Sequence, residues 1–223
     1  MKIDILTLFP EMFDSLNHSI LGRAKEHNKI EINLIDIRNL STNKHKKVDD
    51  YTFGGGAGML MTPEPLYNAI MSVKKEGSYV IYLSPSGNLL NQQKVVTLAK
   101  QKKHIILVCG HYEGIDERVI KLAVDEEISI GDYVLTGGEL AAMIVVDAVS
   151  RYIDGVLGAE HSTEEESFSN GLLEYPQYTR PQTFMGLEVP EVLVSGHHEN
   201  IKKWREQKSL EKTKKVRPDL LKK

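Results

Sequence analysis

The chain has 223 residues, of which 41% are apolar, and a formal net charge of −3, which suits one sizeable core and a small second domain. It has no run of about 18 uncharged apolar residues, and Asp4 interrupts what would be a signal peptide, so we expect a soluble, cytoplasmic protein without a membrane partner. The single cysteine, Cys109, excludes an internal disulfide bond, and its apolar neighbours predict a buried thiol.

Short β-favouring runs alternate with segments of helical spacing along the first part of the chain. The predicted strands are Ile3–Leu8, Ile30–Ile37, Tyr79–Ser84 and His104–Cys109. The predicted helices, several of which begin near Pro, Asn or Asp, are Pro10–His27, Pro63–Lys75, Asn91–Lys102, Ile115–Leu122 and Leu140–Ile153. This alternation predicts an α/β fold with a largely parallel sheet.

The pattern changes after Asp154. The stretch from there to Tyr178 is polar, acidic and aperiodic, which predicts a linker, and the basic segment from His197 to Lys215 predicts one or two helices. Residues 201–223 hold ten Lys or Arg against three Asp or Glu, a net +7, so residues 1–200 hold 18 against 28, a net −10. A basic tail of this kind is either a solvated helix face or a contact for a polyanion.

Four glycine-rich loops are candidates for ligand binding. The first, Gly54–Gly58, lacks the ending of a P-loop and the spacing of a dinucleotide-binding loop, so we do not expect it to cradle phosphate. The other three, Ser84–Gly87, Gly110–Gly114 and Ile130–Glu139, follow predicted strand ends. Each alone would most simply be a turn. Because ligands bind at the carboxyl ends of parallel strands, the three together predict a small-molecule pocket.

Five blocks of sequence carry a family resemblance over nearly the whole chain. In order, they are Asp49-Asp50 with Gly54–Met61, then Tyr82–Gly87, Gly110–Arg118, Ser129–Leu140 and Gly171–Pro181. Together they closely resemble the TrmD type of tRNA (guanine-N1)-methyltransferase. The resemblance implies a SPOUT-class α/β fold with a C-terminal trefoil knot, a small all-α C-terminal domain, and a homodimer whose active sites are each built from two subunits. The implied domains are 1–157 for the knotted cofactor-binding domain, 158–173 for a flexible acidic linker and 174–223 for a basic tRNA-binding domain.

The resemblance also implies a reaction, in which a methyl group moves from S-adenosylmethionine to N1 of the guanine immediately 3′ of the tRNA anticodon. Guanine N1 carries a proton at neutral pH, so the reaction needs a base and a cation that stabilises the anionic ring. The family's base and arginine correspond to Glu166 and Arg151. The family usually has Asp at the base position, and Glu is one methylene longer with a pKa only about 0.4 higher, so it can serve if the linker accommodates its length.

Binding residues are implied in the same way. The cofactor contacts, mostly through backbone atoms, are Tyr82, Leu83, Ser84, Pro85, Gly110, Tyr112, Glu113, Gly114, Ser129, Ile130, Gly131, Tyr133, Leu135, Gly137 and Gly138. The residues expected to face the target guanine are Asp49, Asp50, Gly54, Gly55, Gly56 and Gly58, and those expected to grip tRNA are Arg180, Lys202, Lys203 and Arg205. Ala141 stands where the family usually has Pro, which would stiffen the start of a helix. A requirement for Mg²⁺ is implied without named ligands.

Three alternative functions fit parts of the sequence. They are a SPOUT methyltransferase that modifies another RNA position, a non-catalytic RNA-binding module, and a nucleotide-hydrolysing protein that uses the Gly54–Gly58 loop. A zinc site at His197-His198 is not expected, because adjacent histidines point differently on a helix, and no DNA partner is expected. The linker is expected to order when tRNA binds, because its composition cannot form a core.

Overall fold

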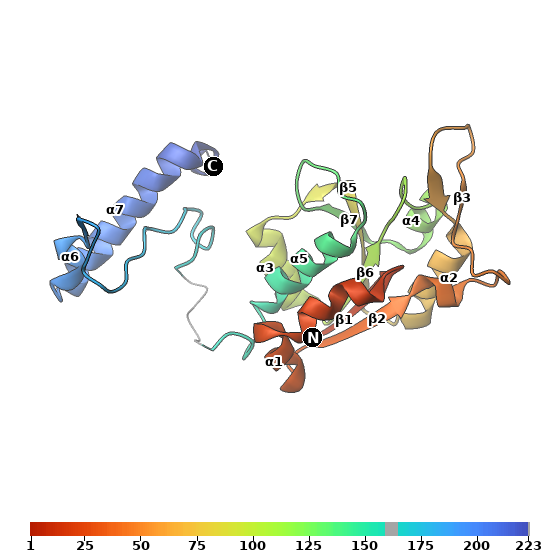
Figure 1. Cartoon of the computed structure of the whole chain (residues 1–223), viewed down its shortest axis with the longest axis horizontal. Coiled ribbons are helices and arrows are strands. Elements are labelled where there is room, and N and C mark those ends of the chain that lie inside the picture. The colour runs from red at the N-terminus through yellow and green to blue at the C-terminus, as the bar shows by residue number, and fades with distance from the viewer. Residues whose placement is uncertain (159–164, 223) are drawn as a thin grey trace. The chain divides into compact units, whose positions relative to one another are not determined.

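A computed structural model describes residues 1–158 and 165–222, which belong to two compact units, Met1–Gly158 and Ala159–Lys223 (Figure 1). The first unit contains a five-stranded sheet of order β2-β1-β6-β5-β7, in which every neighbouring pair is parallel. Its strands are β1 (Lys2–Thr7), β2 (Glu31–Asp36), β5 (Ser78–Leu89), β6 (His104–Cys109) and β7 (Glu126–Ser129). The predicted α/β fold with a parallel sheet is therefore confirmed.

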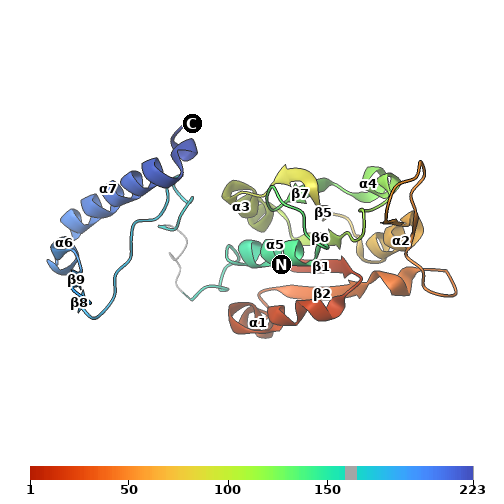
Figure 2. The same cartoon turned by 45° about the horizontal axis from the view of Figure 1, so that its top comes forward.

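Alternate side chains of each central strand enter two separate cores, as the strand period of two requires. On β6, Ile105 and Leu107 lie in one core and Ile106 and Val108 in the other. One face is covered by η1 (Pro10–Asn17), α1 (Ser19–Glu26), α3 (Gln92–Gln101) and α5 (Glu139–Ser150), and the other by η2 (Ile37–Leu40), α2 (Pro63–Val73) and α4 (Glu117–Ala123) (Figure 2). The result is a three-layer α/β/α unit in which the C-terminal part of β5 and the loops after β6 and β7 share one edge.

The expectation of a single helix over Pro10–His27 is wrong. The 3₁₀ helix η1 ends at Asn17 and α1 begins at Ser19, because His18 is extended and Ser19 has a φ of +54°. The turn between them is tight: a Cβ on Gly22 would lie 2.3 Å from the carbonyl oxygen of Asn17. Helical periodicity continues through the break, so apolar spacing alone could not locate it.

The glycine loop Gly54–Gly58 lies at the tip of a hairpin that the sequence did not predict, formed by β3 (Asp49–Tyr51) and β4 (Met59–Met61). The hairpin is fixed to the loop after β6, because the N–H of Met61 donates to the carbonyl of Gly114 at 3.0 Å and the N–H of Asp116 donates to the carbonyl of Met61 at 3.1 Å. The hairpin that carries the glycine loop is therefore held beside the loop after β6, at the edge of the sheet that also bears the loop after β7.

The second unit contains one long helix, α7 (His198–Val216), together with α6 (Glu191–Val194) and η3 (Pro218–Leu221). It also contains a two-stranded hairpin of β8 (Thr183–Phe184) and β9 (Leu187–Glu188), which the expectation of an all-α region did not include. Of the predicted linker 158–173, residues 159–164 lie outside the described residues. No helix within the described part of the chain is long and apolar enough to cross a membrane.

Candidate active site

The C-terminal part of β5 and the loops after β6 and β7 enclose a pocket of about 300 Å³. The expectation that Ser84–Gly87 is a loop after a strand is wrong, because these residues continue β5, whose register against β7 shifts between Leu83 and Asn88. All fifteen residues that the family resemblance assigned to a cofactor line it. The lining includes six residues that the sequence analysis did not single out as contacts: Ser86, His111, Ile128, Val134, Thr136 and Ala141. A volume of this size lies at the lower end of the range of about 300–1,000 Å³ that is usual for small-molecule sites.

Close approach of backbones explains the glycines at the back of this pocket. The N–H of Gly138 donates to the carbonyl of Gly110 at 2.9 Å, so the chain after β7 returns to the start of the loop after β6. A Cβ on Gly138 would lie 2.7 Å from the Cα of Cys109, and a main-chain atom cannot move aside. The pocket therefore depends on glycine here for close packing of backbone against backbone.

A buried carboxylate joins three elements beneath the pocket. Glu139, at the first turn of α5, is only 1% exposed, and it accepts a hydrogen bond from the hydroxyl of Thr7 at 2.8 Å. Its other oxygen lies 3.1 Å from Nε2 of His111, which lines the pocket. A buried carboxylate is costly unless it is paired, and these two partners supply the pairing. No sequence pattern predicts this network, because its members are far apart along the chain.

Two further side chains near the pocket have perturbed acidity. Burial raises the pKa of the Tyr82 phenol, and the nearby Glu127 carboxylate raises it further, so Tyr82 presents a protonated hydroxyl at neutral pH. Burial also raises the pKa of the Cys109 thiol well above its usual range, with Glu139 adding to the effect. Cys109 is therefore an inert, buried thiol, as predicted from its neighbours.

The glycine hairpin lies against the wall of the pocket. A Cβ on Gly58 would lie 2.6 Å from Oε1 of Glu113, and the N–H of Glu113 donates to the carbonyl of Met59 at 3.0 Å. The predicted guanine-facing loop and the predicted cofactor pocket are thus neighbours. Tyr51 and Phe53 are exposed aromatic residues of the same hairpin, which the sequence analysis did not single out.

The two predicted catalytic residues do not line this pocket. Arg151 caps the C-terminal end of α5, whereas Ala141, near its start, lines the pocket. Arg151 lies ten positions after Ala141, about 15 Å along the helix at a rise of about 1.5 Å per residue, which exceeds the reach of an arginine side chain. Glu166 belongs to the second unit. The first unit of one chain therefore forms a pocket whose lining does not include Arg151.

The predicted tRNA-gripping residues differ in their surroundings. Lys202 and Lys203 are exposed on α7, and Lys203 pairs with Glu199 one turn earlier at 3.1 Å. Arg205 contacts the protein instead: its Nη1 lies 3.2 Å from Oε2 of Glu165, and its guanidinium lies 4.7 Å from the centre of the Tyr175 ring. No group of three His, Cys, Asp or Glu among residues 1–158 and 165–222 could hold a metal ion.

Replacing Ala141 with proline is expected to stabilise the first unit. The first main-chain bond of α5 is donated by Ala142 to Gly138, so the N–H of Ala141 precedes the helical ladder and its loss costs no helical bond. Fixing φ in the unfolded chain should raise the free energy of unfolding by about 0.4–1 kcal/mol. Thermal unfolding measures this, with Ala148→Pro in the helix interior as a destabilised control. A lower melting temperature for Ala141→Pro would contradict the expectation.

Comparison with known proteins gives a consistent result. The family described as tRNA (Guanine-1)-methyltransferase TrmD matches residues 1–223. Proteins named tRNA (guanine-N(1)-)-methyltransferase are similar to the chain over its whole length: that of Clostridium beijerinckii is 59% identical and 93% covered, and that of Clostridium novyi is 60% identical and 92% covered. The protein of the same name from Clostridium botulinum strain Hall is 59% identical and 92% covered.

Proposed function

The chain belongs to the TrmD family of tRNA (guanine-N1)-methyltransferases, and from this membership we propose that it methylates N1 of the guanine immediately 3′ of the tRNA anticodon, with S-adenosylmethionine as the donor. The observation that carries the proposal is the pocket at the carboxyl end of the sheet. Its lining contains all fifteen residues that the resemblance assigns to the cofactor, drawn from β5, from the end of β7 and from the loops after β6 and β7.

The lining suits this donor. Backbone amides and carbonyls of the loops after β6 and β7 can read the edge of an adenine, and Ile130 and Leu135 offer apolar cover. When bound, S-adenosylmethionine supplies an electrophilic methyl group on a sulfonium and departs as a neutral thioether. The adjoining Gly54–Gly58 loop, held against Glu113, would receive the guanine, with Asp49 and Asp50 on the same hairpin.

Glu166 and Arg151 would perform the proton chemistry. The carboxylate of Glu166 accepts the proton of guanine N1, which leaves the nitrogen lone pair free to form the new bond to carbon. The guanidinium of Arg151 stabilises the negative charge that develops on the ring as the proton leaves. Neither role requires a metal ion. Mg²⁺ remains a proposal from the family, and with no three-residue ligand group in the described chain it would take most of its ligands from water and RNA.

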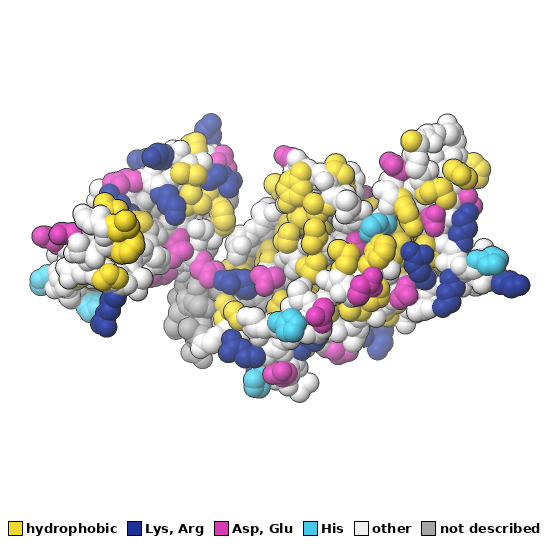
Figure 3. All heavy atoms as spheres, viewed as in Figure 1, with side chains coloured by type: hydrophobic (Ala, Val, Ile, Leu, Met, Phe, Trp, Pro, Cys, Tyr) yellow, Lys and Arg dark blue, Asp and Glu magenta, His cyan; other side chains and the backbone are white. Residues whose placement is uncertain are grey.

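We further propose that the active site is shared between two copies of the chain. Arg151 lies at the far end of α5 from the pocket of its own chain, so a pocket complete with arginine requires a second copy. Hydrophobic side chains gather over α5 and the loop before it (Figure 3). Three apolar side chains of this region are exposed: Val134 by 82%, Leu140 by 47% and Ile144 by 46%. The helix α5 itself is apolar on nearly every side. A helix of that kind is normally covered.

The proposed dimer predicts that one substitution on α5 abolishes both dimerisation and methyl transfer. Ile144→Asp would place a charge on the exposed apolar face of α5 without touching the core, so it should convert a dimer to a folded monomer with no methyl transfer. Sedimentation equilibrium gives the mass, and circular dichroism reports the fold. Glu117→Ala, on a solvated surface of α4, is the matched control and should leave the dimer intact. A wild-type chain that sediments at a single-chain mass would refute the shared site.

We propose that the chain after β7 forms the trefoil knot of the SPOUT class. Two contacts support this: Gly137 forms a β-bridge with His111, and the N–H of Gly138 donates to the carbonyl of Gly110.

We also propose that the C-terminal unit grips tRNA. Lys202 and Lys203 on α7 would neutralise phosphates, which gives affinity and orientation but no sequence information. Base choice would then come from the pocket and the glycine hairpin.

The test of function uses labelled S-adenosylmethionine and two tRNA transcripts that differ only in having guanine or adenine immediately 3′ of the anticodon. We expect label at N1 of that guanine alone. Label at another nucleotide would favour a different SPOUT methyltransferase. Binding of both ligands without transfer would favour a non-catalytic RNA-binding module, and turnover of ATP without a response to S-adenosylmethionine would favour a nucleotide hydrolase.

A further inference from the structure

The residues around Glu166 form a compact turn within the second unit rather than a free strand of linker. The N–H of Phe168 donates to the carbonyl of Leu172 at 2.7 Å, and both the N–H and the hydroxyl of Ser169 donate to the carbonyl of Glu166. The N–H of Glu174 donates to the hydroxyl of Ser167 at 3.0 Å and closes the turn. We call residues 165–174 the base turn.

One buried hydroxyl of α7 bonds the base turn to the helix. Thr213 is 0% exposed, and its Oγ1 accepts a hydrogen bond from the N–H of Leu173 at 2.9 Å while donating to the carbonyl of Ser209 at 2.7 Å. Nearby, the ammonium of Lys212 donates to the carbonyl of Glu174 at 3.1 Å. Because Thr213 is excluded from water, loss of its hydroxyl would leave the N–H of Leu173 without an acceptor, which is costly in a buried place.

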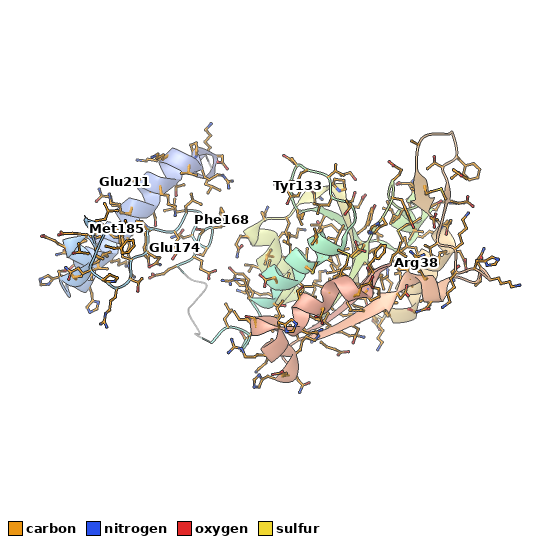
Figure 4. The ribbon with its side chains drawn as sticks, in the orientation of Figure 1. Arg38, Tyr133, Phe168, Glu174, Met185 and Glu211 are labelled. Carbon is orange, nitrogen blue, oxygen red and sulfur yellow. The ribbon has the colours of Figure 1, made fainter. Side chains whose placement is uncertain are left out.

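A second contact holds the beginning of the turn. Oε2 of Glu165 accepts a hydrogen bond from the Tyr175 hydroxyl at 2.7 Å and pairs with Arg205 of α7 at 3.2 Å. The Arg205 guanidinium also covers the Tyr175 ring. Just after the C-terminal end of α7, the Arg217 guanidinium lies 5.9 Å from the ring centre of Phe168. Figure 4 labels Phe168 and Glu174 of the base turn. The turn is therefore tied to α7 on both sides of Glu166.

We propose that Thr213 and Arg205 are positioning residues, which hold the base turn on α7 so that the helix that grips tRNA also carries Glu166 to the guanine. This inference rests on the proposed function and deepens it. Arg205 was expected among the phosphate contacts, and the proposal instead gives it the role of holding the base turn through Glu165 and Tyr175. Tying a base to the element that orients its substrate reduces the misplacement that costs rate.

Thr213→Val tests the first tie, because it keeps the shape of the side chain and removes the hydroxyl. We expect kcat to fall by between about tenfold and 100-fold, with the Kd for tRNA and for S-adenosylmethionine unchanged. Thr213→Ser restores the hydroxyl and should restore kcat. Amide exchange at Leu173 gives a readout independent of activity: it should accelerate in Thr213→Val while amides in the middle of α7 stay protected.

Arg205→Ala tests the second tie through salt dependence. A phosphate contact contributes about 0.9 to the slope of log K against log salt concentration, so Lys203→Ala should lower that slope by about that amount. Arg205→Ala should leave the slope unchanged and lower kcat. The matched variant Glu165→Gln, which removes the partner charge without touching α7, should lower kcat as well. A reduced slope with normal kcat for Arg205→Ala would return this arginine to the phosphate contacts and overturn its positioning role.

These outcomes separate the inference from the function. If the wild-type chain methylates tRNA, Glu166→Gln does not, and Thr213→Val is fully active, then the positioning role is wrong and the function stands. If the wild-type chain transfers no methyl group, the function fails, and the amide exchange at Leu173 still decides whether Thr213 holds the turn. Unchanged exchange at Leu173 in Thr213→Val would overturn the tie itself.

Discussion

Replacing Glu166 with glutamine is expected to reduce the rate of methyl transfer by about 10²–10⁴-fold, the usual contribution of a positioned general base. The amide keeps the size of the side chain but cannot accept the proton of guanine N1. The substitution leaves the main chain unchanged, so the carbonyl at position 166 can still accept the two hydrogen bonds from Ser169 that shape the base turn. Affinities for tRNA and S-adenosylmethionine should therefore stay within about a factor of three of the wild type, or roughly 0.6 kcal/mol.

Single-turnover kinetics at saturating tRNA separates chemistry from binding. Glu166→Asp is the matched control: it keeps the carboxylate and restores the residue usual in the family, so it should remain active. The residual rate of Glu166→Gln should rise steadily with pH, because hydroxide then removes the proton that the side chain no longer accepts. Full turnover by Glu166→Gln would show that another group is the base.

The sequence predicted those parts of the fold that follow from local patterning. The four predicted strands are found because their apolar runs are long enough to fill both cores. β7 was missed because two of its four residues are glutamates, Glu126 and Glu127, which give no apolar run. The hairpin of β3 and β4 was missed because each of its strands has only three residues and the glycine loop between them is longer than a tight turn.

The candidate site also has features that the sequence predicts and features that only the fold reveals. The pocket could be anticipated, because parallel strands bring the glycine loops after them to one edge. The Thr7–Glu139 bond could not, since it joins residues 132 positions apart and depends on how α5 packs against β1. Arg205 was assigned to tRNA binding from the family resemblance of the basic C-terminal segment, and only the fold shows that Glu165 and Tyr175 lie beside it. Family likeness supplied the roles of Glu166 and Arg151, which no local pattern could have given.

Replacing Arg151 with alanine is expected to lower kcat by about 10²–10³-fold, the effect of removing one group that stabilises developing negative charge. The affinity for S-adenosylmethionine should change little, because the proposed role of Arg151 is to stabilise charge that develops on the guanine ring and not to contact the cofactor. Arg151→Lys keeps the charge without the planar donors and should recover only part of the rate. Equal losses in cofactor affinity and in kcat would point to a structural role at the end of α5.

The same variant tests whether each site uses two chains. Leu135→Glu places a charge in the pocket lining and should abolish cofactor binding, so Arg151→Ala and Leu135→Glu are each inactive alone. In a mixed dimer, a shared site places both defects in one active site and leaves the other intact, so activity should return. If each chain used its own arginine, both sites of the mixed dimer would carry one defect, and mixing would restore nothing. Co-expression with two affinity tags isolates the mixed dimer, and its rate should approach half that of the wild type, because one of its two sites is complete.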